Sequence, residues 1–260
     1  MFIDTHCHLN SEQLNNQIDD ILIECQRVGV GLIIVPGYTL ETSKKALEIA
    51  EKYDHVYAVI GYHPTEIKNY GDMEYQWLEE HMNHPKVIGV GEIGLDYHWD
   101  VTTKEEQRYA FIKQIEIAKK YHKPIIIHSR DALLDTLNIL KETNASLVGG
   151  IMHSYAGSAE MSEDFIKLNF LISLGGPVTF LNAKTPKEVA AYVSLNNLLT
   201  ETDSPYLAPH PLRGTTNVPM NVCLVAKTIA EIKGITIDEL NKQVLKNVNR
   251  LFNLEVLDEN

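Results

Sequence analysis

Short apolar runs rich in β-branched residues recur along the chain at intervals typical of alternating strands and helices. Eight such runs are candidate strands, and consecutive runs begin between 23 and 37 residues apart. Each interval holds apolar residues at helical spacing, so the pattern predicts eight βα units and an α/β fold, a (β/α)₈ TIM barrel. The candidate strands are Phe2–Thr5, Gly31–Pro36, Val56–Gly61, Val87–Gly91, Pro124–His128, Leu147–His153, Phe170–Leu174 and Leu198–Glu201.

Helix boundaries carry recognisable capping signals. Thr103 and Thr236 are each followed three residues later by Glu, the capping-box spacing, and Thr185 stands before a proline at a helix start. We therefore expect helices over 103–122 and 236–254, and a further helix near Thr185. The apolar face of the last helix is expected to pack on the barrel rather than on a second copy, which predicts a monomer.

The chain has no low-complexity linker, sequence repeat or long block of charge. Its 260 residues match the length of one barrel, so we expect a single domain over 1–260. The segment 204–219 differs from the rest because its four prolines exclude regular structure. It follows the last candidate strand and is expected to form a rigid loop over the barrel mouth.

Composition places the chain among globular proteins, with 44% apolar and 22% charged residues. The 23 basic and 35 acidic side chains give a formal net charge of −12. General adhesion to anionic polymers is therefore disfavoured. A nucleic acid or phosphate partner would need local attraction from a few basic residues or from bound metal cations.

Cysteine use and the start of the chain indicate the compartment. Cys7, Cys25 and Cys223 are odd in number and show no paired short spacing, so neither a disulfide partner nor a thiolate zinc site is expected. The first residues lack the basic and apolar regions of a secretion signal, and no apolar run approaches the roughly 18 residues of a membrane span. We expect a cytoplasmic protein without membrane association.

The ends of the candidate strands carry side chains that bind metals. In a parallel barrel, functional groups gather where the strands end. The first run leads into His6 and His8, which the two-residue period of a strand sends to one face, while Cys7 faces away. Later runs deliver, one each, Glu92, His128, His153 and Asp203.

These six nitrogen and oxygen donors are enough for two divalent cations, Mg²⁺, Mn²⁺ or Zn²⁺. A carboxylate can bridge two ions, and such a pair generates hydroxide from water and stabilises both oxygens of a displacement. Strand alternation points Glu201 and Asp203 to the same face, with Asp203 nearer the mouth. Glu92 and Asp203 are the candidate catalytic carboxylates. The alternative, a set of structural core histidines, would need an unrelated partner for every ring.

Six motifs extend over nearly the whole chain. They are Phe-Ile-Asp-Thr-His-Cys-His-Leu at 2–9, Gly-Tyr-His-Pro at 61–64, Gly-Glu-Ile-Gly-Leu-Asp-Tyr at 91–97, His-Ser-Arg-Asp-Ala at 128–132, His-Ser-Tyr-Ala-Gly at 153–157 and Glu-Thr-Asp-Ser-Pro-Tyr-Leu at 201–207. Together they resemble the TatD-related metal-dependent deoxyribonucleases of the amidohydrolase superfamily. The resemblance implies a barrel of the metal-dependent hydrolase type.

The resemblance also implies how the ligands are shared. One metal ion would be held by His6, His8, Glu92 and Asp203. The second would be held by Glu92, His128 and His153, so that Glu92 bridges the two ions. Many relatives that hydrolyse esters or amides use a modified lysine as the bridge, and Glu92 in its place favours the nuclease-like branch.

Substrate contacts are expected from glycines and basic residues near strand ends. A Gly-Gly pair follows the seventh candidate strand, where barrels often present backbone N–H groups to phosphate, although a tight turn would also use it. The family often has a further histidine after His-Pro, whereas this chain has Thr65, so no role is assigned to that position. The substrate-binding candidates are His63, Arg130, Gly175, Gly176 and Arg213.

The leading hypothesis is a hydrolase in which hydroxide activated by two metal ions attacks a phosphodiester. A barrel mouth under a loop admits a strand end more readily than a duplex, which favours an exonuclease on single-stranded DNA or RNA. The resemblance implies the same activity, with 3′–5′ polarity. One alternative is a two-metal hydrolase of a carboxylic ester, lactone or aminoacyl bond. Another is a non-catalytic metal- or nucleic-acid-binding protein, against which the intact ligand set and the absence of a basic stripe argue.

Overall fold

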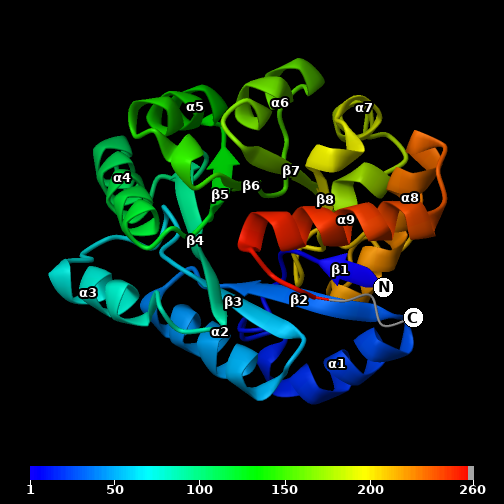
Figure 1. Ribbon diagram of the computed structural model, residues 1–260, viewed down its shortest axis with the longest axis horizontal. Coiled ribbons are helices and arrows are strands. Elements are labelled where there is room, and N and C mark those ends of the chain that lie inside the picture. Colours follow the sequence, from blue (N-terminus) through cyan, green and yellow to red (C-terminus); the bar gives the residue numbers. More distant parts are fainter. Residues whose placement is uncertain (257–260) are drawn as a thin grey trace. The chain divides into compact units, whose positions relative to one another are not determined.

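The computed structural model describes residues 1–256, in which eight strands alternate with helices (Figure 1). The strand order in the sheet follows the sequence from β1 to β8, and the strand pairs with a defined register are parallel. The predicted (β/α)₈ fold class is confirmed. The strands are β1 (Phe2–Asp4), β2 (Val30–Pro36), β3 (Val56–Ile60), β4 (Val87–Asp96), β5 (Ile125–Arg130), β6 (Gly150–Met152), β7 (Phe170–Leu174) and β8 (Leu198–Thr200).

The helices lie between and after the strands. They are α1 (Ile18–Arg27), α2 (Leu40–Lys52), α3 (Asp72–His81), α4 (Lys104–Lys120), α5 (Leu133–Glu142), α6 (Ala159–Ile166), α7 (Thr185–Tyr192), α8 (Val222–Lys233) and α9 (Ile237–Phe252). The capping signals read from the sequence are confirmed, since Thr103 and Thr236 accept hydrogen bonds from backbone N–H groups at the starts of α4 and α9. A proline also occupies the first turn of α7.

The described chain forms two compact units. The first unit comprises Met1–Val35, Ser154–Glu163 and the residues from Leu171 onward, and the second comprises Pro36–His153 and Asp164–Phe170. A single domain over 1–260 stays a prediction, and positions 257–260 of that range lie outside the described residues.

The core of the second unit is built on β4. All ten residues of this strand are buried, and β4 pairs on one side with β3 and on the other with β5. The pairing with β5 continues from Ile93 opposite Ile127 to Asp96 opposite Arg130. As a result β4 ends at Asp96, five residues beyond the predicted end at Gly91, and Glu92 lies within the strand instead of after it.

One further boundary differs from the sequence expectation, and one irregular segment agrees with it. The predicted strand from Leu147 starts later in the structure. Ala145–Leu147 form a 3₁₀ helix after α5, and β6 begins at Gly150. The proline-rich segment 204–219 has no helix or strand before a 3₁₀ turn at Pro219–Asn221, as expected, apart from an isolated bridge at Ser204.

In the first unit, β1 pairs with β2 and β7 pairs with β8. Helix α9 runs beside α8 and buries an apolar face that includes Leu240, Val244 and Val248 (Figure 1). This packing within the chain agrees with the interpretation of the last amphipathic helix.

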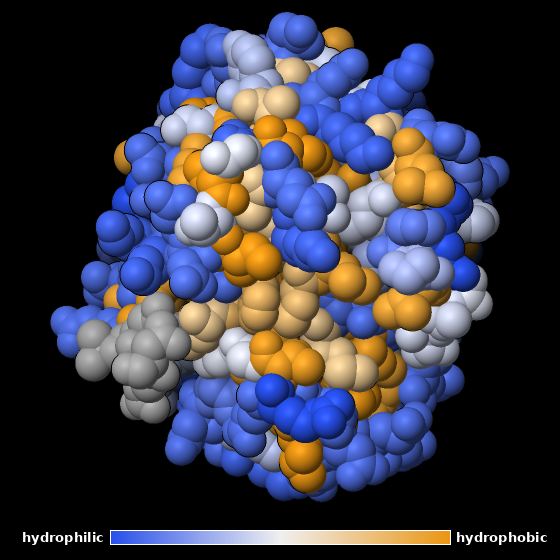
Figure 2. All heavy atoms as spheres, turned by 90° about the vertical axis from the view of Figure 1, so that its right-hand side faces the viewer, coloured by the Kyte–Doolittle hydropathy of each residue, from blue (hydrophilic) through white to orange (hydrophobic). Residues whose placement is uncertain are grey.

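Polar residues dominate the outer face drawn in Figure 2, where hydrophobic residues gather near the middle and hydrophilic ones surround them. Within residues 1–256, none of the helices combines the length and the hydropathy required to cross a lipid bilayer.

Candidate metal centre

The first unit brings together three of the expected ligands. The Nε2 atoms of His6 and His8 lie 3.2 Å apart, and Oδ1 of Asp203 lies 3.9 Å from the first and 3.5 Å from the second. The two rings approach each other, as the His-x-His spacing predicts, although both residues lie beyond the end of β1 at Asp4, and Cys7 between them is fully buried. We call His6, His8 and Asp203 the first cluster.

A buried carboxylate joins the chain segments that carry the first cluster. Oδ1 of Asp4 accepts the backbone N–H groups of Thr202, at 2.9 Å, and of His6, at 3.3 Å, while Oδ2 accepts the Thr202 hydroxyl at 2.6 Å. Asp203 also donates its own N–H to the carbonyl of His6 at 2.9 Å. Burial raises the pKa of the Asp4 carboxyl well above its usual range. The sequence analysis missed this residue, and its signal was a carboxylate two positions before the first histidine.

Glu201 and Asp203 have different surroundings. The Asp203 side chain faces His6 and His8 and is 14% exposed. Glu201 is fully buried, and its Oε1 accepts the backbone N–H of Ser154 at 2.7 Å. The placement agrees with the expectation that Asp203 lies nearer the solvent.

The second unit brings together a second set of ligands around one carboxylate oxygen. Oε1 of Glu92 lies 3.0 Å from Nδ1 of His128, 3.3 Å from Nε2 of His153 and 3.7 Å from Nε2 of His63. The Glu92 backbone N–H donates to Gly37, and that of His153 donates to Ile127 of β5. We call Glu92, His128 and His153 the second cluster, with His63 beside it.

The hydrogen bonds of His63 decide its role. Its Nδ1 accepts the backbone N–H of Thr65 at 3.2 Å and also contacts the Thr65 hydroxyl at 2.7 Å. Nδ1 therefore carries a lone pair, and in the neutral ring the proton sits on Nε2, the atom that faces Glu92. Burial lowers the pKa of His63, and the charge of the neighbouring His128 lowers it further, to about 3. The ring is therefore neutral at pH 7. This arrangement favours His63 as a hydrogen-bond donor at the site, although its ring also lies with Glu92 and His128 in a group whose ligand atoms could hold a metal ion.

Thr65 has a function that the sequence analysis left open. Where the resembled family often has histidine, this chain uses a backbone N–H and a hydroxyl to fix the tautomer of the preceding histidine. The hydroxyl also contacts Oε1 of Glu66 at 3.2 Å.

His128 is held from both sides. Its Nδ1 faces Glu92, and its Nε2 lies 2.9 Å from Oδ2 of the buried Asp96. Oδ1 of Asp96 accepts the backbone N–H groups of His98, at 2.9 Å, and of Trp99, at 3.2 Å. Burial raises the pKa of Asp96, but the hydrogen bond and charge of His128 outweigh it and lower this pKa to about 2. An anionic carboxylate on Nε2 leaves Nδ1 of His128 as the metal-binding atom.

Gly94 allows the strands to approach between Glu92 and Asp96. Its φ is +141°, and a Cβ atom there would lie 2.0 Å from the carbonyl oxygen of His128. A larger residue would push apart β4 and β5, the two strands that carry Glu92 and His128.

The donor chemistry of both clusters fits divalent cations. Ligand atoms of His6, His8 and Asp203 lie within 4.8 Å of one another, and so do those of His63, Glu92 and His128. Two imidazoles and a carboxylate suit Zn²⁺ or Mn²⁺, and the carboxylates also suit Mg²⁺.

The other expected substrate residues lie apart from these close contacts. Arg130 is exposed, with its guanidinium 5.6 Å from the Trp99 ring, and the guanidinium of exposed Arg213 lies 4.1 Å from the Phe180 ring. Gly175 and Gly176 are buried, and a Cβ on Gly176 would lie 1.8 Å from the carbonyl oxygen of Leu207. The close approach of two backbones accounts for glycine at 176, and contact with substrate stays a prediction for all of these residues.

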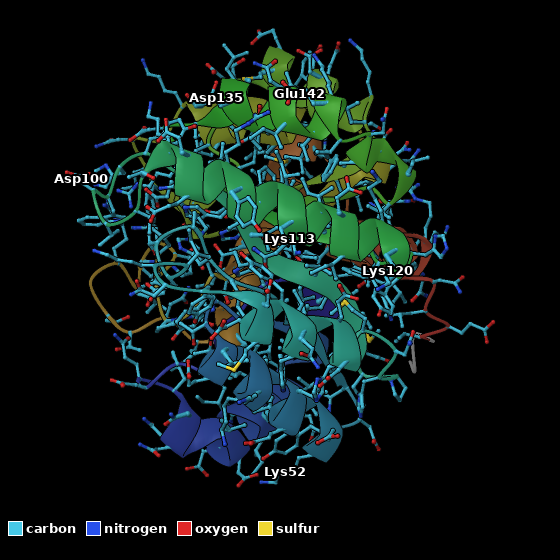
Figure 3. The ribbon with its side chains drawn as sticks, turned by 90° about the vertical axis from the view of Figure 1, so that its left-hand side faces the viewer. Lys52, Asp100, Lys113, Lys120, Asp135 and Glu142 are labelled. Carbon is cyan, nitrogen blue, oxygen red and sulfur yellow. The ribbon has the colours of Figure 1, made fainter. Side chains whose placement is uncertain are left out.

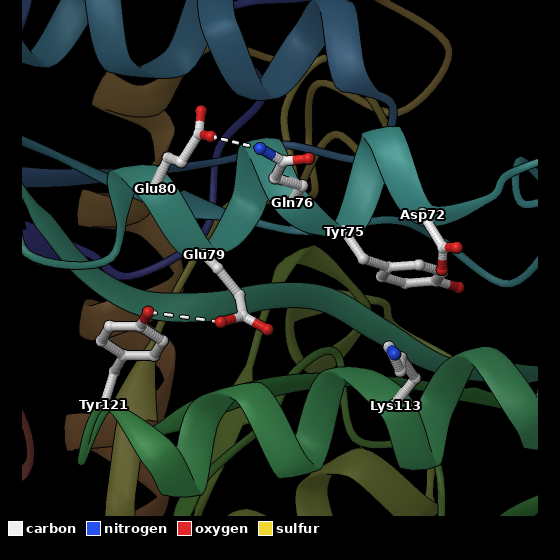
Figure 4. A pocket seen from close by; sticks show the side chains of 7 residues that line it. All are labelled: Asp72, Tyr75, Gln76, Glu79, Glu80, Lys113 and Tyr121. Carbon is white, nitrogen blue, oxygen red and sulfur yellow. Dashed lines mark hydrogen bonds between the residues drawn. The ribbon is translucent and has the colours of Figure 1, made fainter.

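Two surface pockets of the second unit contain none of the cluster residues. One of about 390 Å³ lies between α3 and α4, where the Tyr121 hydroxyl donates to Glu79 (Figure 4). Another of about 310 Å³ is lined by residues of α4 and α5, including Asp135 and Glu142, which Figure 3 shows on α5. Arg108 donates to Glu142 in this pocket. Charged side chains line both pockets, and several of them are hydrogen-bonded to neighbouring side chains.

Comparison with known proteins agrees with this architecture. The family model described as TatD related DNase matches residues 3–253. Over 254 residues the chain is 45% identical to YabD of Bacillus subtilis, covering 98% of this chain and 100% of the relative. Over 256 residues it is 37% identical to YcfH of Escherichia coli, covering 97% and 96%. Both relatives are named as uncharacterized metal-dependent hydrolases.

Solved structures give the same result. The crystal structure of YjjV, a TatD homologue from Escherichia coli, superposes with a TM-score of 0.92 at 32% identity, covering 97% of this chain and 98% of that one. A TatD family hydrolase from Entamoeba histolytica superposes with a TM-score of 0.86 at 25% identity, covering 96% and 97%.

Proposed function

Since this chain belongs to the TatD-related family of metal-dependent hydrolases, we propose that it cleaves phosphodiester bonds of single-stranded DNA or RNA as a 3′–5′ exonuclease. The observation that carries the proposal is the position of Glu92, whose Oε1 has three histidine nitrogens within 3.7 Å. A carboxylate at the centre of a histidine cluster is suited to bridging two metal ions.

The proposed ligands are those of the two clusters. His6, His8 and Asp203 would hold one divalent ion, and His128 and His153 would hold another, with Glu92 shared between the ions. When bound, a pair of Mg²⁺, Mn²⁺ or Zn²⁺ ions supplies an activated water and neutralises charge on the phosphate. What supports the sharing is that Glu92 is a carboxylate surrounded by histidines, the kind of group that bridges two ions.

The side chains of the chain itself have distinct tasks. Asp203 is the proposed proton acceptor for the attacking water, because it is the cluster carboxylate with exposed surface. His63 would donate its Nε2 proton to a non-bridging phosphate oxygen, which its fixed tautomer prepares it to do. Asp96 would hold the His128 ring in the orientation that binds metal.

Recognition of the nucleic acid is proposed to be local. Arg130 and Arg213 are exposed cations beside aromatic rings, an arrangement that suits a phosphate next to a stacked base. Backbone N–H groups at Gly175 and Gly176 are the further proposed phosphate contacts. A net charge of −12 makes such local attraction necessary.

The proposed setting is a monomer in the cytoplasm. All three cysteines are free thiols, as a reducing compartment would keep them. The apolar face of α9 is covered within the chain, which leaves it unavailable for a second copy.

The activity is tested with single-stranded oligonucleotides labelled at the 5′ or the 3′ end. Protein stripped by a chelator and reloaded with Mg²⁺, Mn²⁺ or Zn²⁺ should give a ladder that shortens from the 3′ end. His128→Ala and His153→Ala should abolish turnover, whereas His84→Ala, which removes a histidine paired with Glu51 away from the clusters, should not. Absence of cleavage with every metal, in folded protein, would refute the nuclease proposal and direct the search to lactones and aminoacyl esters.

The shared-ion arrangement is tested by metal content and electron paramagnetic resonance. Wild-type protein loaded with Mn²⁺ should bind two ions that show magnetic coupling, which requires them to be a few ångströms apart. His8→Ala and His153→Ala should each retain one uncoupled ion. Two uncoupled ions in the wild type would show that the clusters act separately.

A further inference from the structure

Helix α4 carries two fully buried glutamines on the face that packs against the sheet. Gln107 and Gln114 are each 1% exposed and stand seven residues apart, two helical turns, so they share a face. The opposite side of the same helix is charged, as Lys113 and Lys120 show in Figure 3. Burying an amide is costly unless both its donor and its acceptor are satisfied. An apolar side chain would cover the sheet without that cost, so the two amides require a specific explanation.

The Gln107 amide makes two hydrogen bonds to the backbone of Asp96 at the end of β4. Its Oε1 accepts the backbone N–H of Asp96 at 2.9 Å, and its Nε2 donates to the carbonyl of Asp96 at 2.8 Å. Nε2 also contacts the Thr102 hydroxyl at 3.1 Å. The Gln107 amide thus makes the pair of hydrogen bonds that a neighbouring strand would make. It makes them at Asp96, the residue whose carboxylate contacts His128.

Gln114 makes the same pair of bonds with the residue that precedes His63. Its Oε1 accepts the backbone N–H of Tyr62 at 2.8 Å, and its Nε2 donates to the carbonyl of Tyr62 at 3.1 Å. On the far side of His63, the Thr102 hydroxyl donates to the carbonyl of Pro64 at 2.7 Å. The backbone is therefore fixed both before and after His63.

Reciprocal bonds of this kind specify position more tightly than apolar packing does. A glutamine that donates and accepts at one backbone residue satisfies both of its groups in a single register, whereas apolar contacts tolerate sliding by fractions of an ångström. Ligand and catalytic groups need to be held within roughly half an ångström of productive geometry. The two amides act on the segments that carry Asp96, which orients His128, and His63.

We propose that Gln107 and Gln114 are positioning residues through which α4 sets the orientation of His128 and of His63 around Glu92. Gln107 acts on His128 through Asp96, and Gln114 acts on His63 through the Tyr62 backbone. The effects on turnover and on metal affinity rest on the proposed function, whereas the effect on backbone protection does not.

The test uses Gln107→Met and Gln114→Met, which keep side-chain length but remove both hydrogen bonds. Gln76→Met on α3 is the matched control, because Gln76 is bonded only to Glu80 on the same helix. In metal-free protein, hydrogen exchange followed by NMR should speed up at the Asp96 amide in the first variant and at the Tyr62 amide in the second. Unchanged exchange at both amides would overturn the proposal, whatever the activity of the protein.

The effect of the two glutamines on the metal site is measured with Co²⁺, whose visible spectrum reports ligand geometry. Gln107→Met should weaken Co²⁺ binding by roughly tenfold and alter the spectrum. Gln114→Met should leave Co²⁺ affinity within about twofold and lower kcat on an oligonucleotide. Folded variants with wild-type Co²⁺ spectra and wild-type kcat would overturn the positioning role. Failure of the wild-type protein to bind Co²⁺ would instead refute the proposed function, and the exchange measurements would still test the contacts.

Two further variants keep the proposal testable if methionine is not tolerated at 107. Gln107→Glu retains the acceptor for the Asp96 N–H and loses the donor, so its effect on Co²⁺ affinity should be intermediate. A double-mutant cycle with Asp96→Asn tests the route. If Gln107 acts through Asp96, the double variant should bind Co²⁺ no more weakly than Asp96→Asn alone. If the double variant instead shows the product of the two single losses of Co²⁺ affinity, Gln107 acts by another path.

Discussion

Nε2 of His128 and Oδ2 of Asp96 lie 2.9 Å apart, and this contact leaves the other ring nitrogen of His128 directed at Glu92, 3.0 Å away. The His128 imidazole therefore lies between two carboxylates, which have different roles. Asp96 is buried and anchored by two backbone N–H groups, which suits an orienting partner. Glu92 faces three histidines, which suits a metal ligand.

Asp96→Asn should weaken metal binding without removing a ligand. The substitution preserves shape but removes the negative charge that makes Nδ1 of His128 a stronger donor, so the dissociation constant of the proposed metal site that includes His128 should rise about 10- to 100-fold. Titration of chelator-treated protein with Co²⁺ measures this directly. Asp131→Asn, which changes an exposed carboxylate beside His98, should leave the affinity unchanged. Equal affinities for wild type and Asp96→Asn would contradict the orienting role.

His63→Ala should separate metal binding from catalysis. The Thr65 N–H on Nδ1 favours a proton on Nε2, so we expect the ring to donate to a substrate oxygen, and both ions should remain in the variant while kcat on an oligonucleotide falls by roughly 10²-fold. Metal analysis and single-turnover kinetics together check this outcome. Thr65→Val is the matched control, since it loses the hydroxyl and keeps the backbone N–H that fixes the tautomer. Loss of one ion in His63→Ala would identify His63 as a ligand instead.

Gly94→Ala should strongly destabilise the protein. The added Cβ would meet the His128 carbonyl oxygen at 2.0 Å in a backbone conformation with φ of +141°, so the free energy of unfolding should fall by about 2 kcal/mol or more. Urea unfolding measures the loss. Gly214→Ala is the comparison, because φ there is +88° but no atom lies within 4 Å of the new Cβ. If both variants lost the same stability, backbone conformation alone would explain the effect and the close approach of β4 and β5 would not.

The histidines and carboxylates of the site could be predicted because a strand has a fixed period and parallel strands end at one edge. His6 and His8 alternate about Cys7, and His128 closes an apolar run, so each could be placed from the sequence alone. The sequence predicts Glu92 beyond the strand because glycines at 89, 91 and 94 weaken strand propensity. The pairing of β4 with β5 extends the strand past it.

The residues that hold the ligands in place could not be predicted in this way. Gln107 looks like an ordinary polar residue of an amphipathic helix, and its partner Asp96 lies 11 residues away in a different element. Asp96 and His128 are 32 residues apart. Such contacts depend on how a helix packs against the sheet, which periodicity does not encode.

Tyr75 gives the protein a specific sensitivity to alkaline pH. Burial raises the pKa of Tyr75, and the charges of neighbouring groups raise it further, to about 12. In the unfolded chain a tyrosine ionises near pH 10. The unfolded state thus loses the phenolic proton first, so this contribution to stability is complete below pH 10 and is lost as pH rises from about 10 to about 12. Urea midpoints measured between pH 9 and pH 12 should fall less steeply in Tyr75→Phe than in the wild type. Tyr206→Phe changes a residue that is 53% exposed and should reproduce the wild-type slope. Parallel curves for wild type and Tyr75→Phe would mean that the Tyr75 phenol ionises as readily in the folded protein as in the unfolded chain.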